Sequence, residues 1–300
     1  MRLASFASIL TLPLLAAALP AQQLDSAAYV DSLRRMESRL EWQTGKVELK
    51  DGLATVDVPQ GWRFLGPEGA ATVVYDMWGN QRVGDGPLGM LFPAEISPSD
   101  PSGWGVVITF DEDGYVKDGE AAKIDYTKLL KDMQKATRAA NEDRAEAGYP
   151  PVELVGWAAT PHYDKATNKL YWAKALRVGD DPEGTLNYDI RALGRRGVLS
   201  MNAVSGMANL TTVETRMTEV LDMVQFNDGH RYADFAPSTD KVAAYGIGAL
   251  IAGKLAVKAG FFKLILAGLL AAKKLVIVAF VAIVGFVKKL FGKKDAPARA

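Results

Sequence analysis

The chain has 300 residues with 35 acidic and 35 basic side chains, so its formal net charge is zero, and it contains no cysteine. The absence of cysteine excludes disulfides, thiolate metal sites and cysteine nucleophiles. The charge is unevenly spread: residues 22–240 hold 34 acidic side chains against 23 Lys and Arg, a net charge of −11, while eleven basic residues lie from Lys241 onward. An acidic body disfavours nucleic acid as a partner, whereas anionic lipid headgroups attract a basic tail.

The first 21 residues have the three regions of a secretory signal peptide. Arg2 is the charged start, residues 3–15 form a short apolar run, and residues 16–21 supply small side chains for cleavage. We therefore predict a signal peptide over residues 1–21 and an extracytoplasmic location for the residues that follow. An uncleaved anchor is the alternative.

A membrane segment is predicted at residues 242–287, which are almost wholly apolar apart from lysines and precede a basic cytoplasmic tail at 288–300. In its best span, 264–287, fifteen Leu, Ile, Val and Phe residues oppose two central lysines. Each apolar residue favours insertion by about 0.3–0.6 kcal/mol and each lysine opposes it by about 2.5–3.5 kcal/mol, so this helix alone is marginal. Three arrangements are compatible with this segment: one crossing plus an interfacial helix, a two-helix hairpin, or helices packed so that the lysines face inward. The basic tail favours one crossing of the inner membrane.

The first elements of the middle region are a helix and a hairpin. Apolar residues at helical spacing predict a helix at 26–41, and a hairpin is expected over 47–58 about a two-residue Asp51-Gly52 turn. Later strands are predicted from apolar runs and alternation at 62–65, 88–92, 105–110, 152–158, 170–178, 185–192 and 198–204. The strand at 185–192 alternates strictly between apolar and polar residues, which predicts one wet face.

Two further helices are predicted from their caps. Asp125 is the expected N-cap of a helix that ends near Ala147, and Thr211 with Glu214 forms a capping box for the second. Strands in runs with helices laid over them indicate an α+β fold: a mainly antiparallel sheet with two or three packed helices, followed by a C-terminal membrane-anchor helix region. The domain is expected to span residues 22–226, with a polar linker at 227–241.

Several short runs occur together in an order and spacing that resemble one known family. They are Asp113-Gly114-Tyr115-Val116-Lys117-Asp118, Gly156-Trp157 with Pro161-His162-Tyr163-Asp164, Leu170-Tyr171-Trp172-Ala173, Leu193-Gly194-Arg195-Arg196-Gly197, and Asp240-Lys241-Val242-Ala243-Ala244-Tyr245-Gly246. From about Trp42 to the tail, the chain resembles a bacterial membrane-anchored family, domain of unknown function 2167. The resemblance implies an envelope location, a C-terminal membrane segment and no particular activity. The strand order with a late helix is also similar to PsbP-like and Mog1-like sheets, which is a fold analogy.

Residues 109–120 come close to a calcium-binding loop. Asp111, Asp113 and Glu120 stand at loop positions 3, 5 and 12, with a glycine at position 6. Thr109 replaces the carboxylate of position 1, and a lysine occupies position 9. A solvated hairpin turn is therefore the favoured interpretation, a weak divalent-ion site is the alternative, and we assign no metal site.

His162 and Asp164 resemble a general base with its orienting carboxylate, since residues two apart on an extended segment point the same way. No nucleophile accompanies them, because Ser200 and Ser205 lack the glycine-flanked elbow of common hydrolases. A turn at residues 161–164 is the favoured interpretation, and we assign no catalytic residue.

An anion-binding fork is one interpretation of a cluster at the end of a predicted strand, Asn187, Arg191, Arg195 and Arg196. Salt bridging to nearby Asp189 or Glu183 is favoured instead. Of the six tryptophans, Trp78 lies in a Gly-rich loop and is the one we expect to contact a ligand.

The sequence therefore predicts a non-enzymatic, cofactor-free envelope protein. Its domain is expected to bind a small ligand or a protein partner at the outer face of the inner membrane, with the lipid bilayer as a further partner. Two alternatives stay open: an envelope hydrolase that uses His162 and Asp164, and a membrane-assembly component whose apolar tail acts by oligomerising.

Overall fold

The computed structural model describes residues 26–80, 82, 84–100 and 102–253. These residues belong to the first of the two units into which the chain divides, residues 1–253. The predicted signal peptide, the basic tail and most of the predicted membrane segment lie outside the described residues.

The described residues form eleven strands and five α-helices, joined by turns and short helical segments. The strands are β1 (Trp42–Gln43), β2 (Gly45–Leu49), β3 (Ala54–Val58), β4 (Trp62–Leu65), β5 (Gly89–Pro93), β6 (Val106–Asp111), β7 (Val152–Asp164), β8 (Lys169–Val178), β9 (Thr185–Leu193), β10 (Val198–Gly206) and β11 (Val224–Phe226). The α-helices are α1 (Ser26–Glu37), α2 (Pro67–Ala71), α3 (Tyr126–Glu146), α4 (Leu210–Met223) and α5 (Ile247–Ala252). The other helical segments are η1 (Thr72–Met77), η2 (Ala121–Lys123), η3 (Met207–Asn209) and η4 (Tyr232–Asp234).

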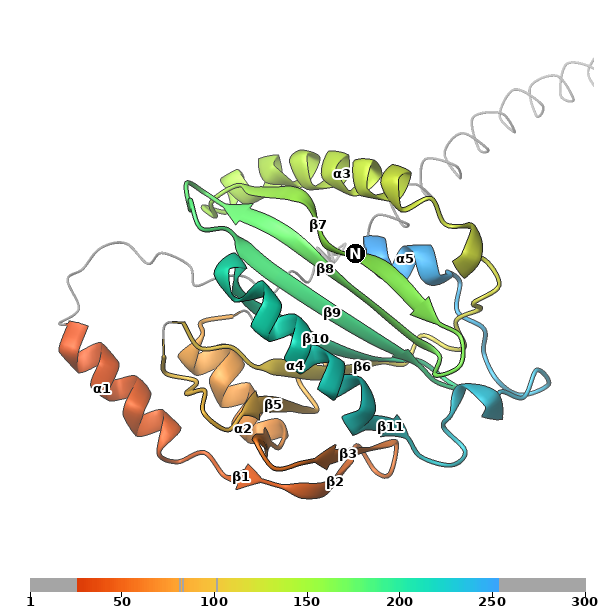
Figure 1. Ribbon diagram of the computed structural model, residues 1–300, viewed down its shortest axis with the longest axis horizontal. Coiled ribbons are helices and arrows are strands. Elements are labelled where there is room, and N and C mark those ends of the chain that lie inside the picture. Colours follow the sequence, from red (N-terminus) through yellow and green to blue (C-terminus); the bar gives the residue numbers. More distant parts are fainter. Residues whose placement is uncertain (1–25, 81, 83, 101, 254–300) are drawn as a thin grey trace, which may run out of the picture. The chain divides into compact units, whose positions relative to one another are not determined.

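Eight strands make one antiparallel sheet in the order β1-β4-β5-β6-β10-β9-β8-β7, and β11-β3-β2 make a second, smaller sheet (Figure 1). The long strands β7 to β10 follow one another as hairpins, as their alternating runs predict. The α+β class with a mainly antiparallel sheet is thus confirmed.

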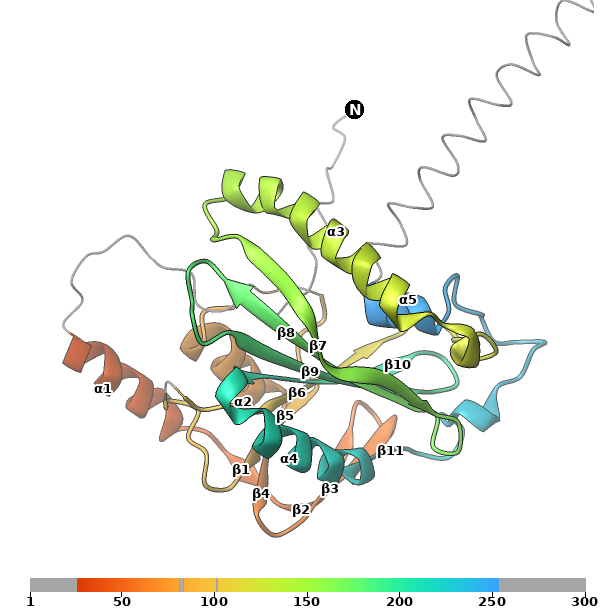
Figure 2. The same ribbon diagram turned by 45° about the horizontal axis from the view of Figure 1, so that its top comes forward.

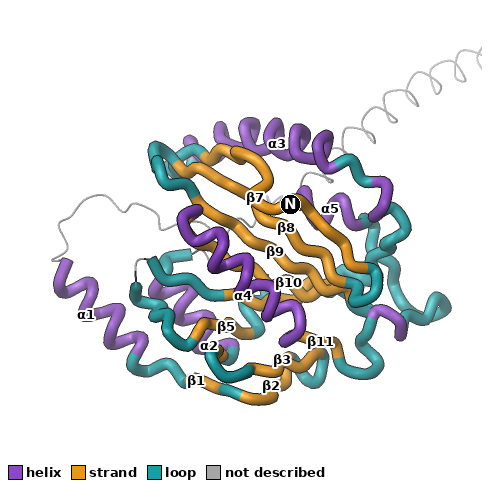
Figure 3. Tube along the Cα trace, viewed as in Figure 1, coloured by secondary structure: helices purple, strands orange, loops and turns teal. Residues whose placement is uncertain are grey.

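Helices cover both faces of the large sheet (Figures 2 and 3). On one face α4 packs through Val213, Met217 and Val220 in the largest apolar cluster, which also includes residues of both sheets. On the opposite face α3 and α5 cover the β7–β8 end, while α1, α2 and η1 cover β4 and β5. The sheet therefore carries two separate apolar clusters on this second face.

The longest helix, α3, begins where the sequence predicts. The Asp125 carboxylate accepts hydrogen bonds from the backbone N–H groups of Thr127 and Lys128, both at 3.0 Å, which satisfies two free donors of the first turn. Further along, the Gln134 amide donates to two carbonyls of β7, and Asn141 exchanges two hydrogen bonds with Val152. These side chains occupy backbone groups of an edge strand that would otherwise be open to pairing.

Three local predictions are wrong in detail. The β2–β3 loop has four residues rather than two, because Leu49 pairs with Ala54 and positive φ angles run from Lys50 to Gly52. The capping box at Thr211 does not form, because α4 already begins at Leu210 behind the 3-10 turn η3. Strand β7 continues to Asp164, through residues that we expected to form a turn.

Residues 227–241, expected to be a linker, pack along the end of the sheet. Tyr115 stacks between Tyr232 and Phe235, with ring centroids 4.4 and 3.9 Å away. Its backbone also accepts from Ala243 and donates to the Lys241 carbonyl, so it forms a parallel bridge with Val242. Stacking and backbone pairing therefore order this segment without a long apolar run.

The first part of the predicted membrane segment also lies in the domain. Helix α5 buries Ile247, Leu250 and Ile251 in the cluster beneath α3. Within the part of the chain that the structure describes, no helix combines the length and apolar composition that a membrane crossing needs.

Candidate ligand-binding face

The most unusual feature of the sheet is a band of buried and half-buried polar side chains, which we call the polar strip, on the face opposite α4. It consists of Lys174 on β8, Asn187, Asp189 and Arg191 on β9, and Ser200 and Asn202 on β10. The strip lies between the apolar cluster beneath α3 and the one beneath α2 and η1. The alternation in β9 predicts a wet face here, and this prediction is wrong: Asn187 and Asp189 are each 2% exposed.

Asp189 is the centre of the strip. Its carboxylate pairs with Lys174 Nζ at 3.2 Å and Arg191 Nη2 at 2.9 Å, and it accepts from Asn202 Nδ2 at 2.9 Å. Burial alone raises the pKa of Asp189, but the two cations and the Asn202 hydrogen bond outweigh burial and hold the pKa below its ordinary value. Asp189 therefore stays ionised inside the sheet.

Trp172 adds a hydrogen-bond donor without an acceptor. It pairs with Asp189 across β8 and β9, and the Arg191 guanidinium lies 5.4 Å from its ring centroid. The residue is 1% exposed, and its indole Nε1 has no hydrogen-bond partner among the described residues. Trp62, Trp78 and Trp157, in contrast, donate to Glu219, Pro98 and Tyr126. A buried donor left unpaired costs about 1–3 kcal/mol, and among the described residues Arg63 Nε is the other buried side-chain atom of this kind.

The strip has more donors than it uses internally. Lys174 has three N–H groups and makes one contact, with Asp189, whereas Arg191 has five N–H groups and contacts Asp189 and, at 3.5 Å, the Ile190 carbonyl. Their side chains remain 16% and 20% exposed, so both reach the surface. Such a surface suits a ligand rich in acceptor oxygens.

Tyr245, just before α5, connects the strip to the C-terminal segment. Its hydroxyl donates to the Asp113 carboxylate at 2.6 Å, and it lies close enough to Arg191 for that charge to act on it. Burial first, and then the Asp113 hydrogen bond, raises the pKa of Tyr245 above its ordinary value of 10, so its hydroxyl keeps donating to Asp113 further into the alkaline range.

Two residues of the calcium-loop pattern, Asp113 and Glu120, form hydrogen bonds with residues in and just before α5. Asp113 accepts from Tyr245, and Glu120 accepts from the backbone N–H of Gly248 at 3.1 Å. Among the described residues, no group of three or more His, Cys, Asp or Glu side chains could hold a metal ion. Asp113 thus contacts Tyr245, just before α5, and Glu120 contacts the first turn of α5.

His162 and Asp164 lie at the end of edge strand β7. His162 is exposed and its ring lies 5.2 Å from that of Tyr171, while the Asp164 carboxylate accepts from Ala166 and Thr167 in the β7–β8 turn. These turn contacts, led by the Thr167 hydrogen bond, lower the pKa of Asp164. The pair is thus part of a hairpin. Trp78, our expected ligand contact, packs edge-on against Phe92.

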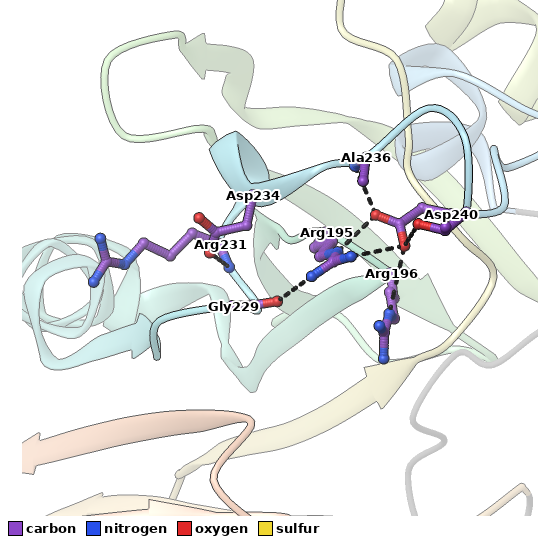
Figure 4. A network of polar contacts seen from close by, with 8 residues as sticks. Arg195, Arg196, Gly229, Arg231, Asp234, Ala236 and Asp240 are labelled. Atoms are coloured by element: carbon purple, nitrogen blue, oxygen red, sulfur yellow. Dashed lines mark hydrogen bonds and ion pairs between the residues drawn. The ribbon is translucent and has the colours of Figure 1, made fainter.

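The arginines of the predicted fork separate into two ion-pair systems. Arg191 pairs with Asp189 as favoured, but Arg195 forms a bidentate pair with Asp240, at 2.6 and 3.1 Å (Figure 4). Arg196 lies 3.8 Å from the same carboxylate. The Arg195 hydrogen bonds first, and then the Ala236 backbone N–H, lower the pKa of Asp240 to about 2. Asp240 therefore fixes the C-terminal segment to the β9–β10 turn.

The family model for proteins of unknown function, DUF2167, matches residues 41–284 of this chain. The chain belongs to this family. The predicted resemblance is thereby confirmed as to the family, whereas the bacterial and membrane-anchored aspects remain predictions. A search of curated proteins finds no match.

The matches among solved structures include the following three proteins. The cyanobacterial PsbP of Synechocystis sp. PCC 6803 is 11% identical, with a TM-score of 0.37, over 63% of this chain and 94% of that one. LpqN of Mycobacterium tuberculosis, involved in cell envelope biogenesis, is 14% identical, with a TM-score of 0.33, over 66% and 95%. The Ran-binding protein Mog1p of Saccharomyces cerevisiae is 12% identical, with a TM-score of 0.32, over 66% and 100%. Similarity at this level carries no functional argument.

Asp189→Asn should destabilise the protein by about 2–3 kcal/mol, because it leaves Lys174 and Arg191 unpaired while both retain some access to water. Urea unfolding monitored by tryptophan fluorescence measures this change. The control is Glu153→Gln, which removes an ion pair with Arg177 whose side chains are 59% and 49% exposed and should cost under about 1 kcal/mol. Equal effects would contradict the central role of Asp189.

The Arg195–Asp240 pair should make stability depend on acid pH. The folded-state pKa of Asp240, about 2, is below its usual 3.8, so the stabilisation is present above pH 3.8 and is lost as the pH falls towards 2. Urea unfolding at several pH values should therefore show wild type and Asp240→Asn converging across this window. Asp76→Asn, which removes the exposed pair with Arg82, is the control. A difference that persists at low pH would refute the assignment.

Proposed function

We propose that this protein is an envelope protein, tethered to the inner membrane by its C-terminal segment, whose extracytoplasmic domain binds a ligand or partner through the polar strip. The tether is supported by the signal-peptide pattern at residues 1–21 and by the apolar run that continues to residue 287 before a basic stop. These two features together predict a domain outside the cytoplasm with a cytoplasmic C-terminus.

Binding through the polar strip rests on one observation, the buried ionic cluster of Asp189, Lys174 and Arg191 beside the unpaired Trp172 N–H. Desolvating such a cluster is costly, and apolar side chains of similar volume often stabilise a fold better. Structural rules tend to be broken where a protein needs a functional group. The strip is therefore best explained by recognition.

The chemistry of the strip indicates the ligand class. The two cations have unused donors at the surface, and the indole N–H lacks an acceptor. A carboxylate or phosphate oxygen complements the two cations through charge-assisted hydrogen bonds, and Trp172, whose ring centroid lies 5.4 Å from the Arg191 guanidinium, is placed to report such binding. We propose an oxyanion-bearing ligand, either free or displayed on a protein partner.

Binding is favoured over hydrolysis by the positions of the expected catalytic residues. A hydrolase needs a nucleophile within hydrogen-bond reach of its base. His162 instead lies exposed on β7 with Tyr171 as its ring neighbour, and Asp164 holds the following turn.

Single-cysteine labelling tests the tether, and the absence of native cysteine makes the label unique. Ser238→Cys, at an exposed position, should react with a membrane-impermeant maleimide in intact cells. Ala298→Cys should react only after lysis. Labelling at both positions would indicate a hairpin, and labelling at neither before lysis would overturn the extracytoplasmic location.

Fluorine NMR of the full chain labelled with fluorotryptophan tests the strip. Of the signals from the six tryptophans, the one missing in Trp172→Phe should shift selectively with inorganic phosphate or succinate. Arg191→Gln should abolish the shift, whereas Arg177→Gln, which changes an exposed arginine on β8, should preserve it. Unselective shifts, or none with either probe, would refute the proposed ligand class.

A further inference from the structure

The solvent side of α3 carries a row of cations. Its members occupy positions i, i+3, i+7 and i+10, and we call them the basic stripe: Lys128, Lys131, Lys135 and Arg138. This spacing places all four on one side of a helix, opposite the buried Met133. Each is exposed, and none forms an ion pair with a described side chain.

The basic stripe stands out against the charge of the domain. Residues 22–240 carry a net charge of −11, yet Asp132 is the one acidic residue between Tyr126 and Arg138. The acidic side chains of α3 otherwise gather in its last turns, at Glu142, Asp143 and Glu146. An anionic surface would therefore attract the first half of α3, although the net charge of the domain is negative.

The last described residue, Gly253, directly follows α5, and α5 packs beside the N-terminal half of α3. Helix α5 packs in the cluster that includes Ile124, Leu129 and Leu130, and the Gly248 N–H donates to Glu120, just ahead of α3. Figures 1 and 2 both show α5 next to the N-terminal end of α3. The sequence continues from Gly253 directly into the apolar run, with Lys254 and Leu255.

We propose that the basic stripe of α3 rests on the anionic headgroups of the bilayer that the C-terminal segment enters. The proposal depends on the tether proposed above. At no more than about 3.3–3.6 Å per residue, the ten residues between Gly253 and the best predicted span at 264 limit the distance of this end of α3 from the bilayer to about 36 Å. The tether thus brings the domain to the membrane, and cations that come within a Debye length of about 8–10 Å of anionic lipid are attracted to it.

This contact defines how the domain is oriented. A domain held only by its tail could rotate freely above the headgroups. With the basic stripe on the lipid, a domain whose residues 22–240 carry a net charge of −11 has one preferred side towards an anionic membrane. Anionic lipid is favoured over a protein partner as the occupant because the tail itself brings this helix to the bilayer.

Fluorescence quenching on the full chain in nanodiscs tests the proposal. One label is placed at Ala139→Cys, exposed on α3, and a control label at Thr215→Cys, exposed on α4. A headgroup-located spin label should quench the α3 label about twofold or more strongly in phosphatidylglycerol than in phosphatidylcholine, and this difference should shrink as salt rises from about 0.05 M to about 0.5 M. The α4 label should respond equally in both lipids.

Charge-matched variants make the test specific. Replacing Lys128, Lys131, Lys135 and Arg138 together with Gln should abolish the lipid difference. Replacing four other exposed basic residues with Gln should preserve the lipid difference. These control positions are Arg35, Arg39, Lys46 and Lys165. Both variants should keep the wild-type circular dichroism spectrum.

The outcomes separate the two proposals. A chain that fails to co-elute with nanodiscs refutes the tether itself. A chain that co-elutes but shows equal quenching of the α3 label in both lipids refutes only the lipid contact. Loss of a co-purifying protein as the sole consequence of the four-fold variant would also overturn it, in favour of a protein partner.

Discussion

The bidentate ion pair between Arg195 and Asp240 is the contact on which the placement of the segment after β11 depends. It fixes the chain after β11 to the β9–β10 turn, and the Tyr115 backbone then pairs with Lys241 and Ala243. These contacts deliver α5 to the cluster beneath α3, where Ile247 and Leu250 complete the core. Residues that follow the sheet therefore complete the hydrophobic core. An ion pair and backbone hydrogen bonds determine where these residues lie.

The large sheet has a different chemistry on each face. Towards α4, the central strands present Leu186, Tyr188 and Ile190 to a continuous apolar core. On the other face the same strands hold the polar strip between two apolar clusters. An ionised carboxylate at the centre of a sheet is tolerated because two cations and an amide satisfy it on all sides. The result is a rigid framework that presents cationic donors at defined positions, as recognition requires.

Local patterns predict the elements well where the determinants are local. Asp125 caps α3 as expected, since an N-cap needs only the next three residues, and alternation predicts β8 to β10. The polar strip is missed because two partners of Asp189, Lys174 and Asn202, come from the neighbouring strands. The periodicity of one strand cannot distinguish a solvated face from a buried face whose polar groups are all paired. The predicted strand ends at residue 158 because Pro161 is typical of a turn, whereas β7 continues to Asp164. Residues 227–241 look like a linker because stacking around Tyr115 requires few apolar residues.

Residues that follow the sheet also decide where the domain ends. Helix α5 is held by the Gly248 N–H on Glu120, the Tyr245 hydroxyl on Asp113 and the Asp240 pair with Arg195, and it contributes Ile247 and Leu250 to the cluster beneath α3. A fragment that stopped after β11 would leave that cluster open to water. The smallest unit that keeps the core closed therefore extends to the end of α5, and an isolated form of this domain has its boundary there rather than at the last strand.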